Sequence, residues 1–520
     1  MTEKNIVSNY KPEIDGIRAF AVIAVIINHF NKELLPSGYL GVDIFFVISG
    51  YVITSSLIRR KSANFLEFIT NFYSRRIKRI IPALIFFVIV MGIFITLFNA
   101  TPKADLRTGL ASLFGFSNLY LLRQSVDYFD FATELSGFAH TWSLGVEEQF
   151  YFIFPIIFWV SGLKKDISKF EKSFFLIMIF LTTVSLISFI HIYRINQPYA
   201  YFLMPTRFWE IASGSILFML TKKKNFLIKK VENIQPLIIL ILMILTLFLP
   251  ISFGLITTIS MVFLSSLLII CLKKNTLCFR LLTNQAVVFI GLMSYSLYLW
   301  HWGILTIARW TIGIDAINTG ILIALIFLIS FFSYEYIEKQ FRNLNIKKTH
   351  IFSIGITSII LGSISINILE RFRNFLFLGD INLVTEWGAI SGSKINSKCY
   401  TNGNDIKNNL RRCSINYSKG ILNQKEFILL GDSHARAHVF LGNYLAKKEE
   451  GIFRFIRCDN VAFPPLILSK SNKALENYEC GRRLLNFIVK NLNSKQVIIL
   501  SARWQTLFFE DYPDLSNLSK

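Results

Sequence analysis

The sequence has 520 residues, of which 53% are hydrophobic, and a formal net charge of +22. Its mean hydropathy of +0.49 excludes an ordinary soluble globular protein. The positive charge does not indicate nucleic-acid binding, because the lysines and arginines gather in alternate loops between long apolar runs. We therefore expect a polytopic protein of the lipid bilayer, with no nucleic-acid partner.

Eleven apolar segments are long enough, or nearly long enough, to cross a bilayer. They cover residues 16–31, 40–58, 80–99, 142–162, 173–192, 203–220, 235–249, 252–272, 286–308, 316–336 and 350–369. A further stretch, 108–122, contains several polar residues and is expected to be re-entrant or interfacial. Eleven spans place every basic loop and the N-terminus in the cytosol, and residue 370 onward outside. No signal-peptide cleavage site precedes the first span, which we expect to remain uncleaved.

The first two spans contain ionisable residues. Arg18 and His29 are eleven residues apart, about three helical turns, and therefore share one face of the first span. Asp43 lies in the second span. Charged groups in hydrocarbon are costly and usually face a bundle interior or a water-filled path. The alternative is an arginine that only sets topology and a histidine that only fills the core.

Three later spans have polar residues at helical spacing on one face. In the fourth, sixth and ninth spans respectively, these are His140, Ser143, Glu147 and Tyr151; Arg207 and Glu210; and Ser294, Tyr298 and His301. Each set alone could be structural, because Arg–Glu pairs hold bundles together and Tyr and Trp mark the membrane interface. Four polar-faced helices in one bundle favour a transfer or transport site.

A basic cluster precedes the third span. Arg75, Arg76, Lys78 and Arg79 lie within five residues on the predicted cytosolic side. The cluster is explained by topology alone, but it could also hold a phosphorylated donor, because arginine pairs well with phosphate oxygens.

From about residue 375 the composition becomes that of a soluble domain with four cysteines. An even number of cysteines in an exported domain predicts two disulfides in an oxidising compartment. Three connectivities are possible, and we favour the sequential one, Cys399–Cys413 and Cys458–Cys480. Cys271 and Cys278 border a predicted cytosolic loop and are expected to be free thiols.

The segment KEFILLGDSHARAHVFLGNYL predicts a buried strand at 427–430, a glycine turn, and a helix from about Ser433. A serine at such a turn is exposed and lies near helix N-terminal N–H groups that could stabilise an oxyanion. The alternative is an ordinary helix-capping serine.

Seven motifs occur in a fixed order between residues 10 and 345: GIRAFAVIAVIINH, GYLGVDIFFVISG, FYSRRIKRIIP, TWSLGVEEQFY, PTRFWEIASG, GLMSYSLYLWHW and SYEYIEKQFR. Together they resemble the bacterial membrane acyltransferase family called acyltransferase type 3. The resemblance implies O-acylation, usually O-acetylation, of surface sugars with a cytosolic acyl-CoA as donor. It matches the family's functional positions to Arg18, His29, Arg76, Arg79, Glu147 and Arg207. Gln340 departs from the proline usual in the family.

Gly-Asp-Ser-His at 431–434 resembles the nucleophile motif of SGNH-type hydrolases, a domain fused to this transferase in a known subgroup. The resemblance implies that Ser433 is the nucleophile, and VIILSARW resembles a later core strand. The Asp-x-x-His that SGNH domains place near their C-terminus has no match here, since no histidine follows His438. We expect a truncated domain; a degenerate, glycan-binding domain is the alternative.

The predicted fold is a membrane all-α multi-helix bundle with about eleven transmembrane helices, followed by a partial α/β SGNH-hydrolase-like domain. The acyltransferase domain would cover 10–345, an additional transmembrane helix 350–369, and the exported domain 375–520. We expect a bacterial inner-membrane protein with a cytosolic N-terminus and a periplasmic or extracellular C-terminal domain. The sequence does not indicate an oligomeric state.

The predicted function is transfer of an acyl group, most simply acetyl, from an acyl-CoA donor such as acetyl-CoA to a surface-glycan hydroxyl such as that of lipopolysaccharide O-antigen. His29 would be the base, with Glu147 available to orient it, and Ser433 would act in the exported domain. Arg18, Arg76 and Arg79 would hold the donor, and no bound cofactor or metal is expected. The remaining predicted membrane-site residues are Asp43, Arg207, Glu210, Ser294, Tyr298 and His301. The alternatives are a transporter or acyl-group channel without transfer chemistry and, less favoured, a non-catalytic scaffold.

Overall fold

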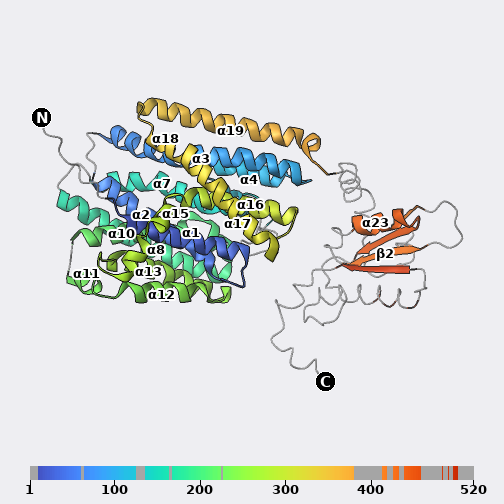
Figure 1. Ribbon diagram of the computed structural model, residues 1–520, viewed down its shortest axis with the longest axis horizontal. Coiled ribbons are helices and arrows are strands. Elements are labelled where there is room, and N and C mark those ends of the chain that lie inside the picture. The colour runs from blue at the N-terminus through green and yellow to red at the C-terminus, as the bar shows by residue number, and fades with distance from the viewer. Residues whose placement is uncertain are drawn as a thin grey trace, which may run out of the picture. The chain divides into compact units, whose positions relative to one another are not determined.

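A computed structural model describes residues 10–59, 64–124, 135–162, 167–223, 226–379, 413–417, 425–431, 439–457 and 496–501, and three single positions near the C-terminus. The chain divides into two compact units, Met1–Gly379 and Asp380–Lys520. The first unit is helical and the second contains a small sheet (Figure 1).

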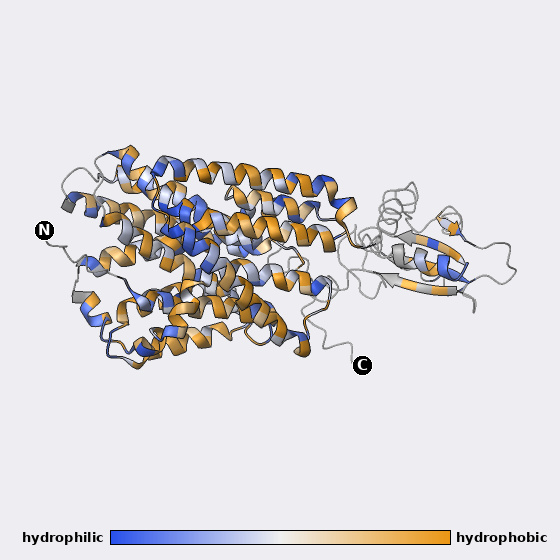
Figure 2. Ribbon diagram, turned by 45° about the horizontal axis from the view of Figure 1, so that its top comes forward, coloured by the Kyte–Doolittle hydropathy of each residue, from blue (hydrophilic) through white to orange (hydrophobic). Residues whose placement is uncertain are grey.

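The helical unit is built from long apolar helices, with hydrophilic positions interrupting them (Figure 2). Its longer helices are α1 (Pro12–Phe30), α2 (Gly41–Ile58), α3 (Phe65–Phe98), α7 (Trp142–Val160), α8 (Ile167–Ile195), α10 (Met204–Lys223), α12 (Pro236–Leu247), α13 (Gly254–Cys271), α16 (Ser294–Trp310), α17 (Ala316–Phe332) and α19 (Lys348–Leu376). Shorter helices are α4 (Lys103–Leu113), α5 (Ser117–Arg123), α9 (Gln197–Phe202), α11 (Phe226–Val231), α14 (Leu277–Leu282), α15 (Gln285–Leu292) and α18 (Lys339–Asn343). Single turns are η1 (Gly38–Leu40), η2 (Ala139–Thr141), η3 (Ile251–Phe253) and the π-helical η4 (Ser333–Glu338).

The eleven apolar segments fall on helices, segment 286–308 on the bent pair α15 and α16, but their number as membrane spans stays a prediction. By length and composition six helices in the described residues qualify as spans, or seven if the bent pair α15 and α16 counts as one. Helices α1, α7 and α10, which contain ionisable residues of the predicted site, are not among the six. The expected re-entrant stretch 108–122 forms parts of two short helices, α4 and α5, separated by a turn at Gly115, whose φ is +71°.

The bundle is held by very close helix contacts at glycines. A Cβ built on Gly50 of α2 would lie 1.7 Å from the carbonyl oxygen of Ile211 in α10, and one on Gly214 of α10 would lie 1.9 Å from that of Val47. Small residues allow such backbone approach in membrane bundles. Helices α2 and α10 are therefore packed with no room for a side chain between them. Helix α19 lies along α3 (Figure 1).

The second unit contains a four-stranded sheet of order β1-β3-β2-β4, formed by β1 (Ser414–Asn416), β3 (Ile452–Arg457), β2 (Glu426–Gly431) and β4 (Gln496–Ser501). Strand β2 runs parallel to β3 and β4, whereas β1 is antiparallel to β3. Helix α23 (Val439–Lys448) packs on β2 and β3. The predicted strand at 427–430 lies within β2, and the VIILS part of the later predicted strand lies in β4.

The cysteine predictions are tested in part. Cys271 and Cys278 are free and buried, as expected. Cys413, in the core of the second unit, is disulfide-bonded. Cys399, Cys458 and Cys480 lie outside the described residues, so the sequential pairing stays a prediction.

Candidate functional site

A cavity of about 760 Å³ lies among helices α1, α2, α3, α7 and α16. Its wall combines apolar side chains of α2 with ionisable residues from several helices. Six cations line it against two carboxylates: Lys11, Arg18, Arg59, Arg76, Arg79 and Arg342, with Asp15 and Glu147. Such an excess of positive charge in a half-enclosed space favours an anionic ligand.

The α1 side of the cavity has its charges partly paired. Arg18 Nη1 lies 2.9 Å from Asp15 Oδ1, and the hydroxyl of Tyr10 donates to Asp15 Oδ2 over 2.8 Å. Partial burial of its hydroxyl and the Asp15 carboxylate raise the pKa of Tyr10 to about 12. Lys11 Nζ donates to the hydroxyl of Tyr51 over 3.0 Å.

The α3 side presents two arginines with no ion-pair partner within 4 Å in the described part of the chain, Arg76 and Arg79. Arg76 is packed between the rings of Phe72 and Tyr151, at 5.9 and 5.5 Å from its guanidinium carbon, and its Nε has no hydrogen-bond partner there. Lys78, between them in sequence, points elsewhere and donates to the carbonyl oxygen of Leu344. Unpaired guanidinium groups facing a cavity are suited to phosphate oxygens.

Glu147 contributes a carboxylate held by two hydroxyl donors. Ser49 Oγ donates to its Oε1 and Tyr151 OH to its Oε2, each over 2.8 Å. Both carboxylate oxygens thus have a donor in the cavity wall, and the orienting role of Glu147 toward His29 stays a prediction. Glu148, the alternative acid, is not among the lining residues. Of the two, Glu147 is the one that a ligand in the cavity could meet.

The buried histidine His29 is paired with another histidine. Its Nδ1 lies 3.0 Å from Nε2 of His301, with the two rings parallel to within 3°. The ring of His140 is 5.9 Å from that of His301, and Trp302 presents an edge-to-face contact to His29 with centroids 4.5 Å apart. We refer to His29, His140 and His301 as the histidine cluster. In the described residues no three His, Cys, Asp or Glu side chains are arranged to hold a metal.

Tyr298 connects the histidine cluster with the cavity. It lines the cavity, and its ring lies 5.5 Å from that of His140 and 5.6 Å from that of His301. Its hydroxyl contacts Ser143 Oγ at 2.7 Å and the carbonyl oxygen of His140 at 2.9 Å. The cavity and the histidine cluster therefore share Tyr298 as a wall.

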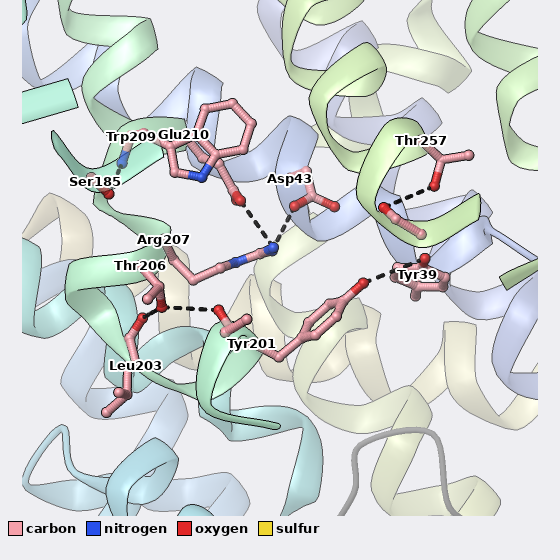
Figure 3. Close-up of polar contacts among 12 residues, drawn as sticks. Tyr39, Asp43, Ser185, Tyr201, Leu203, Thr206, Arg207, Trp209, Glu210 and Thr257 are labelled. Atoms are coloured by element: carbon pink, nitrogen blue, oxygen red, sulfur yellow. Dashed lines mark hydrogen bonds and ion pairs between the residues drawn. The ribbon is translucent and has the colours of Figure 1, made fainter. Parts of the chain in front are cut away.

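Arg207, Asp43 and Glu210 form a separate buried cluster, which does not line the cavity. The Arg207 guanidinium lies between the two carboxylates (Figure 3), with Nη2 bonded to Asp43 Oδ1 and Nη1 2.9 Å from Glu210 Oε1. Its guanidinium carbon is 5.1 to 5.8 Å from the ring centroids of Phe46, Trp142, Phe189 and Tyr201. All three residues are at most 1% exposed. The expected Arg207–Glu210 pair exists, and Asp43 joins it from α2.

In the second unit, Ser433 lies outside the described residues, so its predicted role is not tested. The chain reaches it two residues after β2 ends at Gly431. Strand β2 lies between the parallel strands β3 and β4. In open parallel sheets, ligands bind beyond the carboxyl ends of strands where the connections diverge to either side. The topology of the described strands is thus that expected of a sheet with a site after β2.

Sequence comparisons match residues 11–338 to a family described as "Acyltransferase domain" and residues 398–519 to "SGNH domain (fused to AT3 domains)". The first match covers more than half of the chain. The chain belongs to the acyltransferase type 3 family. Within that family it is of the kind with a C-terminal SGNH domain, and its apolar helices agree with a membrane protein.

Two relatives of this chain come from Staphylococcus aureus. "Putative O-acetyltransferase SAR0937" of strain MRSA252 is 31% identical over 413 residues, covering 75% of this chain and 66% of the relative. "O-acetyltransferase OatA" of strain NCTC 8325 is 34% identical over 369 residues, covering 66% of this chain and 59% of the relative. The match thus spans less than two thirds of these relatives. No solved structure matches the chain.

Several cavity residues were not singled out from the sequence, among them Ser49, Lys11, Arg59 and Arg342. Ser49 could have been found as a polar residue within the apolar run DIFFVISG. The three cations could not, because lysines and arginines at the ends of spans are explained by topology alone.

Proposed function

We propose that the helical unit transfers an acyl group, most simply acetyl, from an acyl-CoA to a hydroxyl of an envelope glycan. The observation that carries the proposal is the cavity, which six cations line. Tyr298 also lines it and contacts His301, which is paired with the buried His29. A polyphosphate donor with an acyl thioester has the matching chemistry, with several negative charges at one end and an electrophilic carbon at the other. Acetyl-CoA is in this proposal a substrate, and no resident cofactor is invoked.

The residues have distinct roles in this proposal. Arg18, Arg76 and Arg79 hold the donor phosphates, since guanidinium groups pair well with phosphate oxygens. His29 accepts the proton of the acceptor hydroxyl, whose oxygen forms a bond to the acyl carbon. The carbon–sulfur bond then breaks, and the thiolate leaves with the proton that His29 had taken. Glu147, with Ser49 and Tyr151, shapes the cavity wall beside the arginines.

We place the arginine-lined end of the cavity at the cytosol and the SGNH domain on the outer face of a bacterial inner membrane. This orientation follows from the basic loops on alternate sides of the spans. The disulfide at Cys413 supports an oxidising compartment for the second unit. The acceptor class is envelope glycan, of which lipopolysaccharide O-antigen is one member. Ser433 is proposed as the nucleophile of the exported domain.

The test is the O-acetyl content of surface glycans, measured by NMR in a deletion strain complemented with wild type, His29→Ala or His191→Ala. His191 is an exposed histidine of α8 and serves as the matched control. We expect wild type and His191→Ala to restore acetyl, and His29→Ala to lose it by about 100-fold or more, the usual range for a general base. Full restoration by a well-expressed His29→Ala would reject His29 as the base and favour a transporter or acyl-group channel.

A further inference from the structure

His29 and His301 lie 272 positions apart in sequence and meet at a ring-to-ring nitrogen contact of 3.0 Å. Two imidazole nitrogens at this distance form a hydrogen bond only when one of them carries a proton and the other does not. Two bare nitrogens would oppose their lone pairs, and two protonated ones would oppose their hydrogens. The question is therefore which nitrogen donates.

A contact with the backbone of α16 identifies the donor. His301 Nδ1 lies 2.9 Å from the carbonyl oxygen of Leu297, one helical turn earlier. A carbonyl oxygen can only accept, so Nδ1 of His301 must carry a proton. A neutral imidazole has a single N–H, and Nε2 of His301 is then the acceptor. The hydrogen between the rings consequently belongs to Nδ1 of His29.

This deduction requires His301 to be neutral, and its surroundings favour that state. The ring is fully buried, and burial disfavours a charged imidazole. A cation is already close, because Arg309 Nη2 donates to the carbonyl oxygen of His29 over 2.6 Å. The nearest rings, those of His29, His140 and Tyr298, supply no negative charge.

We infer that His301 is a positioning residue, which holds His29 with its proton on Nδ1 and so makes Nε2 of His29 the proton-accepting nitrogen. The inference rests on the proposed acyl transfer for its catalytic meaning, but the tautomer itself follows from the geometry alone. In the transfer step, the acceptor hydroxyl gives its proton to Nε2 while its oxygen bonds to the acyl carbon. When the carbon–sulfur bond breaks, the thiolate takes that proton from Nε2, and His29 returns to its first state.

Without His301, the Nδ1–H of His29 loses the acceptor that it meets in this structure. The ring is also restrained by the edge of Trp302 and by the fixed backbone at Arg309, but neither contact selects a tautomer. His301 thus supplies an acceptor for Nδ1, which the contacts with Trp302 and Arg309 do not. Removing it should lower turnover by leaving the wrong nitrogen protonated part of the time, with little effect on donor binding.

The first experiment measures the tautomer directly. Full-length protein labelled with ¹⁵N-histidine is reconstituted in bilayers, and the His29 signals are assigned by their loss in His29→Gln. We expect wild type to show a protonated Nδ1 and an unprotonated Nε2 at neutral pH, and His301→Leu to show a mixture or the opposite form. A protonated Nε2 in the wild type would overturn the inference, whatever the variants do.

The second experiment separates positioning from packing. Transfer of radiolabelled acetyl from acetyl-CoA to glycan is measured in inside-out membrane vesicles containing wild type, His301→Leu or His301→Gln. Glutamine keeps an acceptor oxygen near the place of Nε2, whereas leucine fills the space without one. We expect kcat to fall about 100-fold for leucine with the KM for acetyl-CoA changed less than about threefold, and to stay within about tenfold of wild type for glutamine.

Equal losses for the two variants, or a loss that lies in KM, would overturn the positioning role. No transfer by the wild type would instead reject the proposed function, and the spectrum would still decide the tautomer. The two failures are therefore distinguishable.

Discussion

Two groups of buried charged residues in the helical unit differ in whether their cations have ion-pair partners. In the cluster of Arg207, Asp43 and Glu210, one guanidinium lies between two carboxylates and four aromatic rings, with no access to the cavity. Around the cavity, Arg76 and Arg79 have no ion-pair partner in the described residues, and Glu147 is held by hydroxyl groups. The cation of the first group is paired with carboxylates of the protein, while the second group leaves its positive charge available to a ligand.

Whether an arginine has an ion-pair partner distinguishes a structural arginine from a ligand-binding one better than its burial in the bundle does. A buried cation that the protein itself neutralises connects helices, here α2 to α10. A cation that faces a cavity without a partner costs stability, and membrane proteins usually retain such residues for a function. On this ground we assign Arg207 to the scaffold, although the family resemblance places it among functional positions.

The largest expected effect is that of Arg207→Leu. Removing the cation leaves Asp43 and Glu210 buried beside each other, and breaking a buried ion pair costs about 3–5 kcal/mol. We expect loss of folded protein, measured as a fall in melting temperature and in the monodisperse fraction on size exclusion in detergent.

The matched control for this prediction is the combined variant Asp43→Asn, Arg207→Leu and Glu210→Gln, which removes all three charges. It should recover much of the lost stability. If Arg207→Leu were stable but inactive, the cluster would belong with the cavity and the comparison would fail.

Asp105 of α4 is a third kind of buried ionisable group, a carboxyl with no cation beside it among the described residues. It accepts hydrogen bonds from Ser136, Asn99 and the backbone N–H of Gly137. Burial raises its pKa from 3.8 to about 6 despite these bonds. Because the pKa is higher in the folded state, the stability that Asp105 contributes is present below about pH 4 and lost as the pH rises through 6.

The contribution of this carboxyl amounts to about 3 kcal/mol at most. We expect the melting temperature of Asp105→Asn relative to wild type to be clearly higher at pH 7.5 than at pH 4.5, as followed by thermal unfolding at both values. A difference that does not vary with pH would show that Asp105 titrates normally.

The smallest of these effects concerns Arg76 and Arg79, the two cavity arginines without an ion-pair partner in the described residues. Arg76→Ala and Arg79→Ala should each raise the KM for acetyl-CoA by about 10- to 100-fold, the value of a charge-assisted hydrogen bond, without lowering stability. Lys78→Ala is the control, since Lys78 lies between them but contacts Leu344. Equal effects of all three substitutions on acyl transfer would mean that only the overall charge of the loop matters.

Much of this architecture follows from local pattern. The helices lie where apolar runs predict them, and the strand before Gly-Asp-Ser is present because a short β-rich run precedes a glycine turn. Helical spacing placed Arg18 and His29 on one helix, and in the structure Arg18 faces the cavity while His29 joins the histidine cluster. One apolar run was misjudged, since the expected single helix at 286–308 is bent by 68° between α15 and α16.

What could not be predicted are the partners brought together from distant segments. Nothing in the spacing of His29 indicates His301, and the contact of Ser49 with Glu147 joins residues 98 positions apart. Arg207 and Glu210 are neighbours on one turn and were expected to pair, but Asp43 arrives from 164 positions away. Such contacts are set by how helices pack, which a single sequence shows only as a polar face.

The glycine contacts between α2 and α10 also decide where this protein can be engineered. Because Gly50 and Gly214 admit no Cβ, no residue at either position can be enlarged to adjust the bundle. Val42, Phe45 and Ser49 of the same helix line the cavity, so this part of its wall rests on a backbone held against α10. Attempts to change donor selectivity should therefore alter side chains on α1, α3 and α7, and a mutational library that spares the α2–α10 contact should keep most of its members folded.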